Sequence, residues 1–82
     1  MLTDLIRALD HEQKTELYRR RIGPGLLGDW KMGRRLPTEV QVVDLAEVTG
    51  TEWAELQKEI TVMRAPEERR AQIAKALNWR KR

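Results

Sequence analysis

Apolar residues recur along the chain at the spacing of amphipathic helices. Near the N-terminus this pattern, i, i+3, i+4 and i+7, is followed by Leu2, Leu5, Ile6 and Leu9. It predicts a first helix that begins around Thr3. Asp10, followed by Gln13 three residues later, resembles a capping box and predicts a second helix over residues 11–21. The apolar face of that helix is thin, because it contains only Leu17 and Tyr18.

Glycine and proline residues delimit a short third helix. Gly23 can adopt a positive φ, as a sharp turn requires, and Pro24 suits the first position of a helix. The apolar residues of this helix are Leu26, Leu27 and Trp30. Gly25 and Gly28 each weaken it by about 1 kcal/mol relative to alanine, so it forms only by packing against the rest of the chain. Gly33 is expected to follow its last turn.

Three further helices are predicted in the second half of the chain. Thr38 and Gln41 form a capping-box sequence, and Gly50 ends the helix that they open. Thr51 is expected to cap the fifth helix, and Pro66 is expected to open the sixth. The apolar stripes of the three helices are Val42, Leu45, Ala46 and Thr49, then Trp53, Leu56, Ile60 and Met63, then Ile73, Ala74 and Leu77. Because no segment has a convincing strand pattern, the sequence predicts an all-α fold of five or six helices.

Composition limits the classes of function. The 82 residues suffice for one small domain, and no apolar run approaches the roughly 20 residues that cross a membrane, so we expect a soluble protein without membrane association. The N-terminal residues lack the basic region and cleavage site of a signal peptide, which predicts a cytoplasmic location. The chain contains no cysteine or serine and only one histidine, His11. We therefore expect neither an enzyme nor a protein that holds a metal or another cofactor.

Charged residues are distributed unevenly along the chain. Residues 1–37 contain eight basic and five acidic side chains, residues 38–63 contain one and six, and residues 64–82 contain seven and two. Two basic ends around an acidic middle indicate a surface that faces a polyanion. Solvated helix faces would produce the same pattern, so composition alone leaves both interpretations open.

The order of the predicted elements, with Ile22 after a turn and Leu27 and Trp30 on the buried side of the following helix, is that of a helix-turn-helix domain. The run W-x-x-G-R-R-x-P and the sequence LAEVTG follow at matching distances. In these features residues 13–50 resemble the lambda-repressor-like (Cro-like) helix-turn-helix family of phage and bacterial regulators. The whole chain is then one domain, with a helix-turn-helix core over 1–50, C-terminal helices over 51–78 and a basic tail over 79–82.

This resemblance implies a sequence-specific DNA-binding transcriptional regulator, expected to be a phage or prophage repressor that binds as a homodimer with its third helix in the major groove. The implied contacts to double-stranded DNA are Gln13, Lys14, Pro24, Gly25, Gly28, Asp29, Lys31, Met32, Arg34 and Arg35. The sequence departs from the family at Leu17 and Arg21, where alanine and glycine are usual. It also lacks side-chain donors and acceptors at Gly23, Pro24 and Gly25, which occupy base-reading positions.

Several of these residues also have structural interpretations. Arg34 and Arg35 can neutralise phosphates or satisfy the C-terminus of the third helix. Gln13 can contact a phosphate and also act as a capping residue. Trp30 and Trp53 are expected in the core, because each lies on an apolar stripe.

A protein partner is the alternative to DNA. The segment GPGLLGD offers little chemistry for base edges but allows the backbone or an apolar surface of another protein to approach. Leu26 and Trp79 are the candidate contacts with such a partner or with a second copy of the chain. The alternative function is therefore a small phage-type inhibitor or adaptor that uses a helix-turn-helix scaffold.

Overall fold

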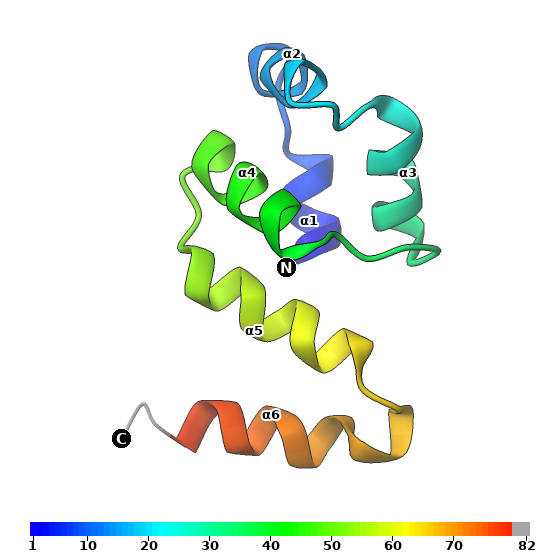
Figure 1. Ribbon diagram of the computed structural model, residues 1–82, viewed down its shortest axis with the longest axis vertical. Helices are drawn as coiled ribbons and strands as arrows, with labels where there is room; N and C mark the ends of the chain where they lie inside the picture. The colour runs from blue at the N-terminus through cyan, green and yellow to red at the C-terminus, as the bar shows by residue number, and fades with distance from the viewer. Residues whose placement is uncertain (80–82) are drawn as a thin grey trace.

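The computed structural model describes residues 1–79 and confirms the all-α fold (Figure 1). Its six α-helices are α1 (Leu2–Arg7), α2 (His11–Arg19), α3 (Pro24–Met32), α4 (Glu39–Thr49), α5 (Trp53–Arg64) and α6 (Arg70–Trp79). A 3-10 turn over Glu67–Arg69, preceded by Pro66, leads into α6, and residues 1–79 contain no strand. The side chain of Trp79 and residues 80–82 lie outside the described part, so the predictions of a partner contact there and of a basic tail concern positions that it does not cover.

The helices enclose one hydrophobic core. α1 packs on α3, α2 on α4, and α4 on α5, whereas α6 lies against α5 at the far end of the molecule from α2 (Figure 1). The buried apolar residues that form the core are Leu2, Ile6, Leu9, Leu17, Ile22, Leu27, Trp30, Val42, Leu45, Ala46, Leu56 and Ile60. Every helix from α1 to α5 therefore contributes to the core. Among the described residues, no helix combines the length and the apolar character that crossing a membrane requires.

The turn between α2 and α3 is made by a left-handed residue two positions after the end of α2. Arg21 has a φ of 66°, whereas Gly23, for which the sequence predicted a positive φ, has a φ of −84°. The N–H of Ile22 donates to the carbonyl of Leu17 (2.9 Å), and the N–H of Arg21 donates to the carbonyl of Tyr18 (3.1 Å). These bonds form a Schellman motif, and the buried Leu17 and Ile22 provide its hydrophobic contact. The prediction for Gly23 is wrong because the chain turns two residues earlier.

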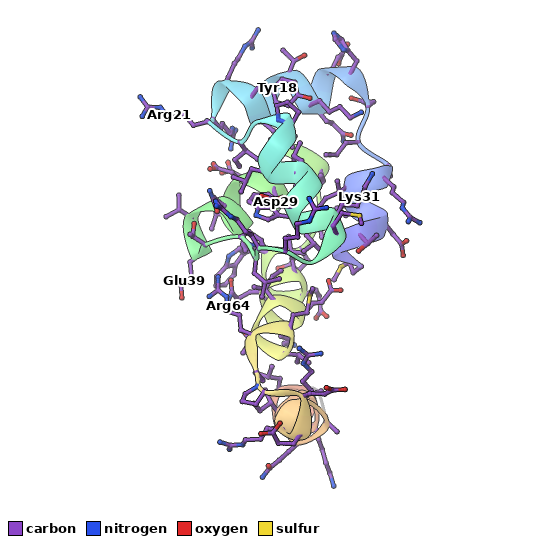
Figure 2. The ribbon with its side chains drawn as sticks, turned by 90° about the vertical axis from the view of Figure 1, so that its right-hand side faces the viewer. Tyr18, Arg21, Asp29, Lys31, Glu39 and Arg64 are labelled. Atoms are coloured by element: carbon purple, nitrogen blue, oxygen red, sulfur yellow. The ribbon has the colours of Figure 1, made fainter. Side chains whose placement is uncertain are left out.

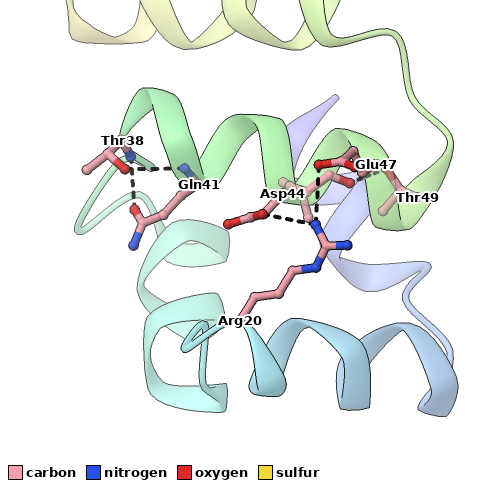
Figure 3. Close-up of polar contacts among 7 residues, drawn as sticks. Arg20, Thr38, Gln41, Asp44, Glu47 and Thr49 are labelled. Atoms are coloured by element: carbon pink, nitrogen blue, oxygen red, sulfur yellow. Dashed lines mark hydrogen bonds and ion pairs between the residues drawn. The ribbon is translucent and has the colours of Figure 1, made fainter.

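Polar contacts fix α4 at its start and against α2 (Figure 3). The predicted capping box is present: Thr38 Oγ1 accepts from the N–H of Gln41 (3.3 Å), and Gln41 Oε1 accepts from the N–H of Thr38 (2.9 Å). Arg20 Nη1 donates to Asp44 Oδ1 at 2.9 Å and to Glu47 Oε1 at 3.4 Å. The hydrogen bond to Asp44 raises the pKa of Arg20 above its ordinary value, and the two contacts link the end of α2 to α4.

The start of α5 differs from the prediction. Glu52, not Thr51, occupies the N-cap position, and the hydroxyl of Thr51 instead shares a hydrogen bond of 2.8 Å with the hydroxyl of Thr49. Trp53 is 46% exposed and does not belong to the core. Trp53 is the first residue of α5, whereas Leu56 on the next turn is fully buried.

Candidate nucleic-acid interface

The two helices around the Arg21 turn present one side of α3 to solvent. In Figure 1 α2 is seen nearly end-on while α3 runs down the page, so the two axes are strongly inclined. Leu27 and Trp30 are buried beneath α3, at 5% and 1% exposure. Figure 2 looks onto the opposite side of α3, where Asp29 and Lys31 are visible. This outer side contains most of the residues that the sequence proposed for contact with DNA.

The first two turns of this outer side are almost bare of side chains. Pro24 and Gly25 are exposed and Gly28 is half-buried. A Cβ atom added to Gly25 or Gly28 would have no neighbour within 4 Å, and neither residue has a positive φ. Neither crowding nor backbone conformation inside the chain therefore requires glycine at these two positions. Their effect is to leave the backbone of α3 open to close approach from outside.

The basic residues after α3 are organised by Asp29. Its carboxylate lies 3.5 Å from Arg34 Nη1 and 3.7 Å from Arg35 Nε, and its carbonyl accepts the N–H of Arg34 at 2.8 Å. Both arginine side chains remain about 70% exposed, so each can still contact a phosphate. The resemblance implies that Asp29 contacts DNA. The structure instead engages its carboxylate with these arginines, a contact that the linear spacing did not indicate.

The N-terminus of α2 contains the other predicted contacts. Gln13 completes a capping box, since its Oε1 accepts from the N–H of Asp10 (2.9 Å) and its own N–H donates to Asp10 Oδ1 (2.8 Å). The capping bond uses the amide oxygen, so the Nε2 group remains a donor for an external anion. Lys14, the next residue, is exposed. Capping by Gln13 and contact with a phosphate are therefore compatible.

A groove of about 310 Å³ lies between α1, α2 and α3. Its lining includes Lys14 and Tyr18 from α2, Lys31 from α3 and Arg7 from α1, and no carboxylate lines it. The sequence predicts Lys14 and Lys31 as contacts, but not Arg7. Only the packing of α1 on α3 brings this arginine to the predicted surface, and no local motif marks it.

Two remaining predictions concern apolar and metal contacts. Leu26 is proposed above as an exposed partner contact. It is half-buried and packs against the core, so its side chain lies toward the inner side of α3. Met32 is 64% exposed and remains available at the end of α3. Within residues 1–79, no three acidic or histidine side chains lie close enough together to hold a metal ion.

Comparisons of the chain with protein-family models, with curated proteins and with solved structures find no match. The arrangement of residues around α3 therefore carries the functional argument.

Proposed function

We propose that this protein is a DNA-binding transcriptional regulator of the lambda-repressor-like (Cro-like) kind, with α3 lying in the major groove. The observation that carries the proposal is the bare outer side of α3. Gly25 and Gly28 weaken the helix and meet no internal requirement. A partner that must approach the helix backbone closely provides a reason for both.

The charge around α3 supports a nucleic acid as that partner. Lys14, Lys31, Arg34 and Arg35 are all exposed and belong to α2, to α3 or to the loop that follows α3. Of these four residues, only the two arginines form an ion pair within residues 1–79, and both pair with the same carboxylate of Asp29. Excess positive charge at this surface would neutralise phosphates on either side of the groove that α3 enters.

The same surface indicates how DNA would be recognised. Pro24, Gly25 and Gly28 have no side-chain donor or acceptor for a base edge, so most direct contacts would come from Lys31 and Met32 at the other end of α3. We propose that phosphate contacts and the shape of the DNA contribute much of the specificity. A homodimer would add a second half-site, with the helices after Gly50 as the proposed pairing surface.

The proposal of a protein-directed adaptor receives less support. Of its two candidate contacts, Leu26 is half-buried and packs against the core. The close approach that GPGLLGD allows would serve a protein as well as DNA, so the choice of DNA rests on the exposed cations Lys14, Lys31, Arg34 and Arg35.

The decisive experiment measures the affinity for duplex DNA by fluorescence anisotropy at several salt concentrations. The variant combines Arg34→Ala with Arg35→Ala, and the matched control combines Arg69→Ala with Lys75→Ala, which removes the same charge at the opposite end of the molecule. Loss of two phosphate contacts per protomer should reduce the slope of log K against log salt by about 2 for each protomer, or about 4 for a homodimer. The control should keep the original slope. Equal slopes for the two variants, or no binding by the unmodified protein, would contradict the proposal.

A further inference from the structure

The groove between α1, α2 and α3 has a chemistry that the proposed DNA contact does not use in full. Its floor is apolar and includes Ile6, Leu9 and Leu27, each between 5% and 7% exposed. Gly28 lies at its edge and contributes no side chain. A phosphate would form no favourable contact with this apolar floor, whereas an aliphatic or aromatic side chain would displace water from it.

The edge of the groove is cationic. Arg7, Lys14 and Lys31 come from three different helices, and all three are exposed. None of them takes part in an ion pair among the described residues, and no aspartate or glutamate lines the groove. Tyr18 adds a hydroxyl at the same edge, with its side chain 42% exposed. Among the described residues, the three cations around the groove therefore have no acidic partner.

We propose that this groove binds an acidic peptide segment of another protein, with one apolar side chain inserted between α1 and α3. The charge of the edge selects carboxylates, and the floor selects the apolar anchor. The volume of about 310 Å³ lies at the lower end of the range for ligand clefts and suits one or two side chains rather than the wide backbone of a duplex.

Peptide binding and DNA binding would exclude each other. Lys14, Lys31 and Gly28 line this groove and also belong to the surface proposed for DNA. A bound acidic segment would therefore occupy the cations that phosphates need. An acidic protein that binds in the groove would therefore act as an antagonist of DNA binding.

The test uses a displayed library of random twelve-residue peptides, selected on the folded full-length protein. Enriched peptides should combine aspartate or glutamate with leucine, isoleucine or phenylalanine. Combining Lys14→Gln with Lys31→Gln should weaken a fluorescein-labelled enriched peptide by about tenfold, as expected for the loss of two exposed charge contacts. The control that combines Arg69→Gln with Lys75→Gln should change its affinity little. Chemical-shift changes on binding should include the amides of Arg7 and Tyr18.

Three outcomes would overturn the proposal: no enriched peptide, enrichment of neutral peptides, or equal weakening by both double variants. If the groove instead follows the DNA backbone, Arg7→Gln will reduce the salt slope of DNA binding by about 1 and no acidic peptide will be enriched. The two proposals are separable. A protein that binds the peptide but not DNA would refute the proposed function alone, and a peptide that duplex DNA fails to displace would refute mutual exclusion.

Discussion

α3 and α4 are neighbouring helices of similar length that are built in different ways. They contain nine and eleven residues, and each ends at a glycine with a positive φ, Gly33 and Gly50. α4 begins with the complete capping box of Thr38 and Gln41, whereas the N-cap residue of α3 is Gly23, which provides no side-chain cap. Stabilising local interactions are therefore concentrated in α4.

The outer sides of the two helices differ in the size of their exposed side chains. α4 exposes full-sized side chains, such as Val40 and Val43, while the first turns of α3 expose proline and glycine. Because α3 lacks a cap and contains two glycines, packing of its inner side must hold it in place. α3 therefore has few stabilising local interactions and an open backbone on its outer side.

The largest effect on stability is expected when the buried side chain of Trp30, on the inner side of α3, is removed. Trp30→Ala should lower the free energy of unfolding by about 3–5 kcal/mol, because this side chain is 1% exposed and anchors an otherwise weak helix. That is a large part of the total for a small domain. Urea unfolding followed by far-ultraviolet circular dichroism would measure it. Val43→Ala on the outer side of α4 is the control and should change stability by less than about 0.5 kcal/mol. A similar result for both variants would show that α3 does not depend on its inner side.

A smaller effect of opposite sign is expected on the outer side of α3. Combining Gly25→Ala with Gly28→Ala should raise the free energy of unfolding by about 2 kcal/mol, since both positions have helical φ and open space for a Cβ. The same variant should bind DNA more weakly if close approach is the function of these glycines. Gly50→Ala makes the same chemical change at a φ of 70° and should lower stability instead. A gain in stability without loss of DNA affinity would remove the main support for the proposed function.

Local signals in the sequence account for most of the fold. The two capping boxes, the start of α3 at Pro24 and its end at Gly33 follow from hydrogen-bonding and backbone preferences within a few residues, and the structure confirms them. The spacing of apolar residues likewise identified Trp30 as a core residue. These features need no knowledge of distant parts of the chain.

Contacts between distant elements explain what the sequence analysis missed. Arg7 reaches the groove only because α1 packs on α3, and no periodic pattern records that placement. Trp53 fits an apolar stripe but is the first residue of its helix, where its side chain is 46% exposed. The engagement of Asp29 with Arg34 and Arg35 depends on the direction of the loop after α3. The candidate site on α3 therefore stays a prediction, to which the structure adds Arg7 and the ion pairs of Asp29.

The smallest effect is expected at the turn that leads into α3. Arg21 occupies the left-handed position that Gly33 and Gly50 occupy after α3 and α4. A side chain with a Cβ is strained there, so Arg21→Gly should raise the free energy of unfolding by up to about 1 kcal/mol, measured by urea unfolding. Arg21→Ala keeps the Cβ while removing the charge, and it should leave stability nearly unchanged. An equal gain for the alanine variant would attribute the effect to charge. A gain in stability with glycine alone would show that Arg21 places a cation beside the start of α3 at the expense of stability. Gly25 and Gly28 expose the backbone of α3 at a similar expense.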